Sequence, residues 1–287
     1  MKGDVIWTSE EAVLATGGSS SFRWVAQGVS IDSRTINNND LFIALEGPNH
    51  DGHLYVADAL KAGAAAAVVN QTPHDVDETA SLLIVDDTQK ALEDMAIFAR
   101  SRVGARVCAI TGSVGKTGAK EALRQCLERS GNTHVNVASY NNLWGVPLSL
   151  ARMPRDTVYA IFEIGMNHPG EITPLVRMVR PHVAIVTTVE AVHLEHFGSI
   201  EAIADAKAEI FNGIEPGGVA ILNYDNCHFL RLQKAAFSAE AKVVSFGIQS
   251  GADVQLNRLA LHPNCSCISA RLREKEVTYK IGIAGRH

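Results

Sequence analysis

Four short, almost continuously apolar runs in the second part of the chain constrain its fold most strongly. Each has the length of a β-strand, and helical stretches separate them; the runs cover residues 107–111, 159–164, 183–188 and 219–223. Strands that are apolar on both faces and separated by helices are typical of a parallel sheet covered on both sides. From residue 253 to residue 282 polar and apolar residues alternate, which predicts an antiparallel hairpin or meander.

A smaller α/β domain is predicted before this sheet. Strand-like runs at residues 41–45, 66–69 and 82–85 alternate with helical stretches at residues 55–62 and 89–102. A glycine-containing break at residues 103–105 follows them, and 287 residues are enough for two domains. We therefore expect an N-terminal α/β domain over residues 1–104 and a second domain, with a mostly parallel sheet, over residues 105–287.

The amino-acid composition indicates which binding partners and which cellular compartment to expect. The chain is 46% hydrophobic and 20% charged, as in globular proteins, and its net charge is −5. A nucleic-acid surface needs clustered Lys and Arg in excess, so nucleic acid is not expected as a partner. Five cysteines without metal-ligand spacing favour free thiols in a reducing compartment. Since the chain has neither a signal-peptide core nor an apolar run of membrane-spanning length, we expect a cytoplasmic protein without membrane contact. We also expect a monomer.

A glycine-bearing segment follows the first apolar run and precedes a helical stretch that extends to about residue 130; it reads Thr111-Gly112-Ser113-Val114-Gly115-Lys116-Thr117. In a strand-loop-helix context, such a loop holds phosphate with backbone N–H groups and the helix N-terminus. The segment departs from GxxxxGK[ST] because Ile110 stands five residues before Gly115, and a plain tight turn is the alternative. We predict a nucleotide-phosphate loop in which Lys116 contacts the terminal phosphates and Thr117 ligates Mg²⁺.

Two polar residues are predicted at the same edge of the sheet as this loop. Glu163 lies in an otherwise apolar strand, where burial of a carboxylate is unfavourable unless a cation or a hydrogen-bond donor contacts it. His193 follows the strand at residues 183–188, so it also comes from the carboxyl edge, where open α/β folds bind ligands. The alternatives are a paired core carboxylate and a surface imidazole. The spacing of His193 and His196 does not match HExxH, which argues against a metalloprotease.

Lys207 lies on the apolar face of a predicted helix over residues 199–211. Ile200, Ile203, Lys207 and Ile210 are spaced i, i+3, i+7 and i+10, which is one face at 3.6 residues per turn. One interpretation is a lysine whose stem is buried and whose ammonium group reaches the rim. Beside a metal–nucleotide site, the other is a lowered pKa and chemical modification of the amine.

With these motifs, the sequence resembles the Mur ligases of peptidoglycan synthesis over nearly its whole length. Residues 30–35, 40–47 and 51–53 look like the uridine-nucleotide-sugar domain that two members of the family share. Residues 141–147 are similar to the family's asparagine-rich substrate loop. The resemblance implies that the UDP-linked substrate is bound by Ser33, Arg34, Asp51, Gly52, His53, Asn141 and Asn142.

The strings at residues 163–172 and 193–199 favour the member of the family that adds D-alanyl-D-alanine over the tripeptide-forming member. The resemblance implies that ATP is bound by Gly112, Ser113, Val114, Gly115, Lys116 and Thr117, and that Mg²⁺ is held by Thr117, Glu163 and His193. Lys207 matches the lysine that is carbamylated in the family, and Lys116, His193 and Lys207 are the expected catalytic residues.

The implied reaction is a ligation in which ATP phosphorylates the terminal carboxylate of UDP-N-acetylmuramoyl-tripeptide, and the amine of D-alanyl-D-alanine then attacks the acyl phosphate. The family has a third, C-terminal domain, and this chain ends about where that domain would begin, so we expect a fragment that binds the UDP-substrate but forms little product. Three alternatives stay open: a tripeptide-forming Mur ligase, a nucleotide-binding switch protein without ligase chemistry, and a non-catalytic substrate-binding fragment. A switch protein would have no use for Asp32-Ser33-Arg34 or for a buried Lys207.

Overall fold

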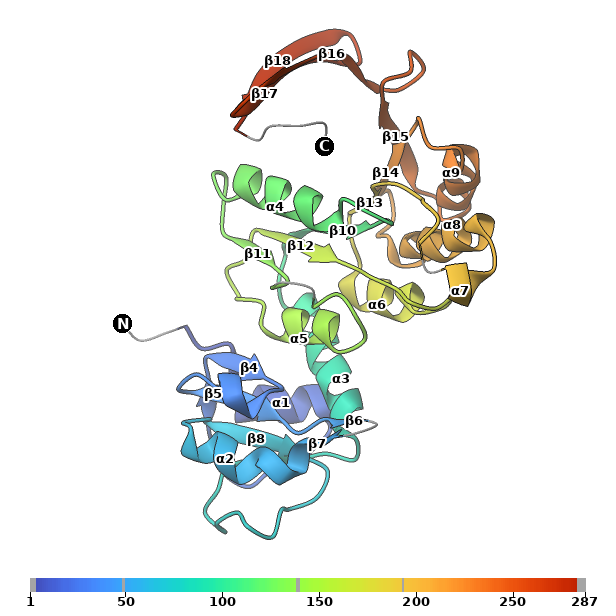
Figure 1. The fold of residues 1–287 in the computed structure, drawn as a ribbon. Helices are drawn as coiled ribbons and strands as arrows, with labels where there is room; N and C mark the ends of the chain where they lie inside the picture. Colours follow the sequence, from blue (N-terminus) through green and yellow to red (C-terminus); the bar gives the residue numbers. More distant parts are fainter. Residues whose placement is uncertain (1–3, 48–49, 138–139, 193, 283–287) are drawn as a thin grey trace. The chain divides into compact units, whose positions relative to one another are not determined.

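The computed structural model describes residues 4–47, 50–137, 140–192 and 194–282. Its contacts divide the chain into two compact units, residues 1–105 with 131–158 and residues 106–130 with 159–287 (Figure 1). The family-domain boundary near residue 104 stays a prediction. The contacts group residues 131–158 with the first unit, although they follow the phosphate loop in the sequence.

The first unit contains, among the described residues, a five-stranded sheet in the order β2-β9-β8-β5-β4. The strands β4, β5, β8 and β9 pair in parallel, and β2 pairs with β9 in antiparallel fashion. The strands are Ser19–Ser20 (β2), Gly28–Ser30 (β4), Asp40–Ile43 (β5), Ala66–Val69 (β8) and Leu82–Ile84 (β9). The three strands predicted in this part of the chain are thus confirmed as β5, β8 and β9.

Helices and short elements complete this unit. The helices are α1 (Ser9–Thr16), α2 (Val56–Lys61), α3 (Thr88–Ser101) and α5 (Gly145–Ala151), with the 3₁₀ turns η1 (Ser33–Thr35) and η2 (Gly52–Tyr55). The remaining short strands are β1 (Trp7–Thr8), β3 (Val25–Ala26), β6 (Glu46–Gly47), β7 (His50–Asp51) and β11 (Thr133–Val135). Helix α3 begins where it does because the Asp87 carboxylate accepts a hydrogen bond from the backbone N–H of Lys90 at 2.9 Å. The predicted helices at residues 55–62 and 89–102 are confirmed as α2 and α3.

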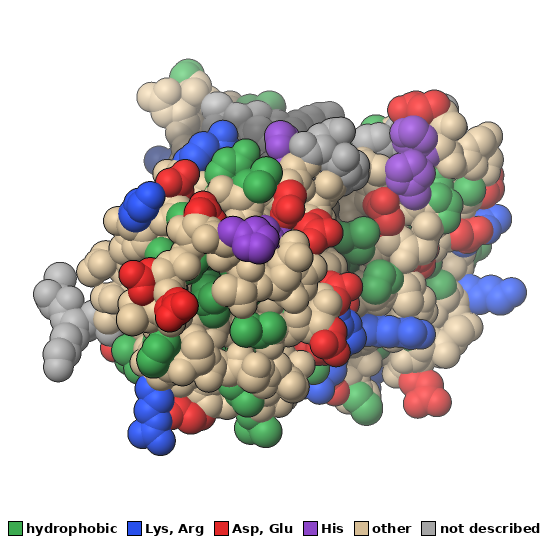
Figure 2. Space-filling model, turned by 90° about the horizontal axis from the view of Figure 1, so that it is seen from below, with side chains coloured by type: hydrophobic (Ala, Val, Ile, Leu, Met, Phe, Trp, Pro, Cys, Tyr) green, Lys and Arg blue, Asp and Glu red, His purple; other side chains and the backbone are tan. Residues whose placement is uncertain are grey.

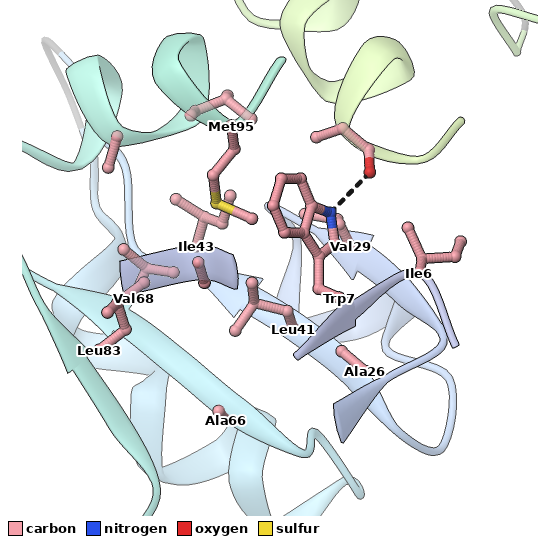
Figure 3. Close-up of a cluster of buried hydrophobic side chains, with 14 of the residues drawn as sticks. Ile6, Trp7, Ala26, Val29, Leu41, Ile43, Ala66, Val68, Leu83 and Met95 are labelled. Carbon is pink, nitrogen blue, oxygen red and sulfur yellow. Dashed lines mark hydrogen bonds between the residues drawn. The ribbon is translucent and has the colours of Figure 1, made fainter. Parts of the chain in front are cut away.

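Alternate residues of β5 supply two hydrophobic cores, one on each face of the sheet. Leu41 and Ile43 pack into a cluster with Trp7 (Figure 3). Phe42 packs into a separate cluster. The indole Nε1 of Trp7 donates a hydrogen bond to the carbonyl oxygen of Ala151 at 2.8 Å, so the polar atom of this buried ring has a partner. This bond and the surrounding apolar contacts tie α5 to the first unit.

The second unit is built on a sheet in which the order of its own strands is β12-β10-β13-β14-β15-β16-β17-β18. The pairs from β12 to β16 are parallel, and β16, β17 and β18 form an antiparallel meander. The strands are Arg106–Thr111 (β10), Tyr159–Glu163 (β12), Val183–Val186 (β13), Val219–Asn223 (β14), Lys242–Gly247 (β15), Val254–His262 (β16), Cys265–Leu272 (β17) and Lys275–Ile281 (β18). The four predicted parallel strands and the predicted meander are confirmed, and β15 is an additional strand.

The helices of the second unit lie on both sides of its parallel strands. They are α4 (Lys116–Leu127), α6 (Ile172–Val179), α7 (Leu194–Phe197), α8 (Ile200–Ala208) and α9 (Phe229–Ser238), with the 3₁₀ turn η3 (Glu209–Gly213) after α8. In Figure 1, α4 lies above β10 and β12, and α6 lies below them. The predicted helix at residues 199–211 is therefore an α-helix that tightens into a 3₁₀ turn at Glu209.

The described surface carries charges of both signs. On the face in Figure 2, acidic and basic side chains are interspersed, in keeping with the small net charge of −5. In the described ranges, each helix falls short of the combined length and apolarity that a bilayer crossing needs.

Candidate active site

The carboxyl ends of three neighbouring parallel strands bring the predicted site residues to one edge of the second sheet. The register places Glu163 of β12 beside Ile110 of β10, and Thr111 of β10 beside Val186 of β13. The phosphate loop leaves β10 at this edge and leads into α4. The loop, the end of β12 and the segment after β13 therefore share one edge, as predicted from their order in the sequence.

The loop after β10 has a backbone that requires glycine at two positions. Gly112 has φ +151°, and a Cβ atom there would lie 1.9 Å from Oγ1 of Thr187. Gly115 has φ +85° and occupies the N-cap position of α4. The Thr187 hydroxyl donates a hydrogen bond to the carbonyl oxygen of Val114 at 2.6 Å, so the segment after β13 holds the loop directly. The positive φ angles of the two glycines and the contacts with the Thr187 side chain thus determine the conformation of the loop.

The N-terminus of α4 is open to an anion. Gly115 offers no side chain to cap the helix, so the first N–H groups of α4 lack a side-chain acceptor from the cap position. Lys116, the first helical residue, donates from Nζ to the carbonyl oxygen of Gly112 at 2.8 Å. Burial lowers the pKa of Lys116, and the Glu163 carboxylate acts in the opposite direction. Free N–H groups, the helix dipole and a lysine together suit a nucleotide phosphate.

Glu163 is the buried carboxylate of the site. Its side chain is only 2% exposed, and its Oε2 accepts a hydrogen bond from the Thr117 hydroxyl at 2.9 Å. This bond joins the end of β12 to the first turn of α4. A hydroxyl oxygen and a carboxylate oxygen at this separation fit the hard oxygen ligands that Mg²⁺ prefers, so Thr117 and Glu163 are the residues that could hold it.

Lys207 is buried on α8, as its position on the apolar face predicted. Its side chain is 3% exposed, and the preceding turn buries Ile203. Burial and, to a smaller extent, the positive charge of Lys116 together lower the pKa of Lys207 to about 7. An amine with this pKa is partly neutral near pH 7, whereas an exposed lysine is almost fully protonated.

Two contacts to the phosphate loop were not among the predicted site residues. Ser113 donates its backbone N–H to the carbonyl oxygen of Thr188 at 2.9 Å, and its Oγ accepts from the backbone N–H of Glu190 at 2.8 Å. The signal for both was the position of Thr188 and Glu190 just after the apolar run that became β13. His193 lies outside the described residues, so its predicted role as a metal ligand stays a prediction.

The residues predicted to bind the UDP-linked substrate all lie in the first unit. The Arg34 guanidinium bonds both carboxylate oxygens of Asp32, at 2.9 and 2.7 Å, and Ser33 begins the same 3₁₀ turn. Asn142 accepts the backbone N–H of Gly145 at 2.9 Å through its side chain. Asn141 precedes it in the same loop.

A second group of these residues surrounds the start of η2. The Nδ1 of His53, whose side chain is 5% exposed, lies 2.7 Å from an Asp51 carboxylate oxygen. The Nε2 of His53 accepts the backbone N–H of Asn70 at 3.2 Å, so Nδ1 carries the proton. A Cβ atom on Gly52 would lie 2.7 Å from the backbone of Leu45, so this position is closely packed. The bond to Asn70 holds the Asp51-Gly52-His53 segment to the residue after β8, and the packing of Gly52 places it against Leu45, just after β5.

Comparison with known proteins matches both parts of the chain. Residues 110–287 match the Mur ligase middle domain, and residues 25–100 match the Mur ligase family catalytic domain. The UDP-N-acetylmuramoyl-tripeptide–D-alanyl-D-alanine ligase of Rickettsia prowazekii is 38% identical over 253 residues, which is 88% of this chain and 56% of that protein.

Solved structures agree in fold. A crystal structure of MurF from Acinetobacter baumannii superposes with a TM-score of 0.87 at 31% identity, covering 98% of this chain and 61% of the other. The MurF ligase from Thermotoga maritima in complex with ADP superposes with a TM-score of 0.75 at 25% identity, covering 88% of this chain and 57% of the other. The chain spans about half the length of the curated relatives it matches. Because the middle-domain model alone matches more than half of the chain, the chain belongs to the Mur ligase family.

Proposed function

We propose that this chain is the nucleotide-binding and UDP-substrate-binding part of an ATP-dependent ligase that adds D-alanyl-D-alanine to UDP-N-acetylmuramoyl-tripeptide. One observation carries the proposal: the loop with Lys116 lies at the same sheet edge as the hydrogen-bonded pair of Thr117 and Glu163. The charge of Lys116 also contributes to the lowered pKa of the buried Lys207. The names of the curated relatives support this choice of substrates.

ATP is the proposed phosphate donor, bound by the loop from Gly112 to Thr117. The open N-terminus of α4 and the Lys116 ammonium group offset the negative charge of the phosphates. Thr117, Glu163 and His193 are the proposed Mg²⁺ ligands. Mg²⁺ bound there would neutralise phosphate charge during phosphoryl transfer.

Lys116 acts on the transferred phosphate. Its ammonium group donates a hydrogen bond to the carbonyl oxygen of Gly112, which directs it along the loop. On phosphate binding it exchanges that acceptor for a phosphate oxygen and stabilises the charge that spreads over the transferred group. The carboxylate of the tripeptide becomes an acyl phosphate, and attack by the amine of D-alanyl-D-alanine then releases phosphate.

Lys207 is proposed to be carbamylated. Its partly neutral amine can add CO₂, with the N–C bond forming as one proton leaves the nitrogen, and the product is an anion. This replaces a buried cation near Lys116 with a negative charge, which removes the repulsion that lowers the pKa of Lys207. An anion in this position can support the cations of the site.

The first unit is proposed to bind the UDP end of the substrate through Ser33, Arg34, Asp51, Gly52, His53, Asn141 and Asn142. Further proposals are that residues 1–104 and 105–287 correspond to the first two family domains and that the protein is a cytoplasmic monomer. On this division of labour, the chain alone binds UDP-N-acetylmuramoyl-tripeptide but forms little product. The tripeptide-forming alternative is not favoured, because a solved relative of that type is similar only in fold, at 20% identity.

ADP release by the full-length protein tests the function. With Mg-ATP and UDP-N-acetylmuramoyl-tripeptide present, we expect sustained ADP release only when D-alanyl-D-alanine is added. A single diamino acid is the matched control, offered with UDP-N-acetylmuramoyl-dipeptide. Sustained release with the diamino acid, but not with D-alanyl-D-alanine, would assign the tripeptide-forming activity instead.

A further inference from the structure

Helix α6 begins without a cap from its own N-terminal segment. Glu171 occupies the N-cap position but makes no side-chain cap bond. Its carboxylate accepts the backbone N–H of Asn167 at 2.7 Å and lies 3.1 Å from Nδ1 of His168 instead. The first N–H groups of a helix have no partner within the helix, so the start of α6 needs an acceptor from elsewhere.

Glu209 of η3 supplies that acceptor from a distant part of the chain. Its Oε1 accepts the backbone N–H of Gly170 at 2.7 Å. Its Oε2 accepts both the backbone N–H of Thr173 at 3.0 Å and the Thr173 hydroxyl at 2.9 Å. A carboxylate bonded to several donors at a helix N-terminus is also favoured by the helix dipole. Glu209 therefore caps α6 across 36 to 39 residues of sequence.

The other end of η3 is held against α6 as well. The Asn212 side-chain amide donates to the Thr173 hydroxyl at 3.0 Å. A Cβ atom on Gly213 would lie 2.3 Å from the carbonyl oxygen of Val176, so η3 approaches the backbone of α6 directly. Both ends of η3 are thus fixed to the first two turns of α6.

The contact between η3 and α6 lies close in sequence to two elements of the candidate site, the strand of Glu163 and the helix of Lys207. Residues 164–171 connect the strand of Glu163 to α6, and α8, which carries Lys207, ends one residue before Glu209. A change in the position of η3 would therefore move the last turn of α8. Lys207, only two residues before Glu209 and 3% exposed, would lose part of its burial.

We propose that Glu209 is a positioning residue: by capping α6 it fixes the end of α8 and keeps Lys207 buried in the site of Glu163 and Lys116. The catalytic use of Lys207 rests on the proposed function. The positioning itself does not, and the test below needs neither nucleotide nor ligase substrates.

The test is the reactivity of Lys207 toward an acetylating reagent as a function of pH, read by peptide mass spectrometry on this chain in CO₂-free buffer. In the unaltered chain, we expect slow acetylation with a midpoint near pH 7, since burial both shields the amine and lowers its pKa to about 7. In Glu209→Gln, the amide keeps the volume but loses the charge and one acceptor. We expect a midpoint at least about one pH unit higher and a plateau rate at least about tenfold faster.

Ser199→Ala is the matched control. The Ser199 hydroxyl caps the opposite end of the same helix, where it accepts the backbone N–H of Ala202 at 3.1 Å. This variant also loses one helix cap, but its Lys207 profile should match that of the unaltered chain. An unchanged profile in Glu209→Gln, or equal shifts in both variants, would overturn the proposal.

If Glu209→Gln does not fold, as judged by circular dichroism, Thr173→Ala provides a milder form of the same perturbation. It removes the hydroxyl donor to Glu209 and the acceptor of the Asn212 amide, and it leaves the two backbone donors to Glu209 in place. The midpoint should then move in the same direction by a smaller amount. A folded Thr173→Ala variant with an unchanged midpoint would refute the positioning role.

Discussion

Replacement of Lys207 by methionine should stabilise the second unit at low pH. Lys207 is 3% exposed, and burial together with the charge of Lys116 lowers the pKa of its amine from the ordinary 10.5 to about 7. Below pH 7 the folded state therefore holds a buried charge. Between pH 7 and 10.5 the unfolded state binds more protons than the folded state, so the stability of the unaltered chain rises with pH over this window.

The size of the effect follows from the same values. A change of one pKa unit corresponds to about 1.4 kcal/mol, so the full penalty at a pH well below 7 is about 5 kcal/mol. Part of it remains at pH 9, because the unfolded lysine is still protonated there. We expect the stability advantage of Lys207→Met to shrink by about 3 kcal/mol between pH 6 and pH 9.

The assay must report on the second unit, because all three tryptophans, Trp7, Trp24 and Trp144, belong to the first. Cys108 of β10 is half-buried and serves this purpose, since burial raises the pKa of its thiol to about 12 and we therefore expect slow alkylation in the folded chain. Its alkylation in increasing urea, resolved by peptide mass spectrometry in CO₂-free buffer, gives the unfolding midpoint at each pH. Lys234→Met, an exposed substitution on α9, is the control and should leave the pH dependence unchanged. An advantage for Lys207→Met that does not vary with pH would refute a buried, partly neutral amine.

Three further substitutions test the phosphate site by calorimetry with Mg-ADP. Gly112→Ala should weaken binding at least about tenfold, because its Cβ would collide with the Thr187 hydroxyl. Gly118→Ala is the control and should leave the affinity unchanged, because there is open space around its Cβ. Equal affinities of the two variants would show that the loop does not bind the nucleotide. Lys116→Ala should weaken Mg-ADP binding and raise the pKa of Lys207, since a nearby positive charge is lost; wild-type binding would remove the lysine from the phosphate site. Glu163→Gln should raise the Mg²⁺ concentration needed for nucleotide binding, and an unchanged requirement would leave Glu163 with a structural role only.

The sheet edge could be predicted from sequence because it depends on local patterns. The apolar runs determined the strands, and the order of strand, loop and helix placed Lys116, Thr117 and Glu163 together. The burial of Lys207 was predicted from its spacing relative to Ile203 and Ile210, since helical periodicity specifies a face without knowledge of what packs on it.

Other features depend on contacts between distant segments, which local patterns do not encode. The strand β15 was not predicted, because Lys242 and Ser245 interrupt its apolar pattern, although pairing with β14 stabilises it. The contact between Thr187 and the phosphate loop depends on which strand neighbours β10. Nothing in the sequence of residues 131–158 indicates a return to the first unit; long-range contacts show it, such as the bonds of Ala151 to Trp7 and of Arg152 to Val29.

Isotope scrambling in ATP tests the proposed acyl phosphate most directly. The full-length protein is incubated with Mg-ATP that carries ¹⁸O in the β,γ-bridging position, and the migration of the label to a non-bridging position is followed by ³¹P NMR. The account predicts scrambling that requires UDP-N-acetylmuramoyl-tripeptide and proceeds without D-alanyl-D-alanine, because the tripeptide carboxylate accepts the phosphoryl group before the amine attacks. Scrambling that does not need the tripeptide would contradict it. The absence of scrambling with the tripeptide would also contradict it, if the protein ligates D-alanyl-D-alanine at a normal rate and ADP can leave the site and rebind.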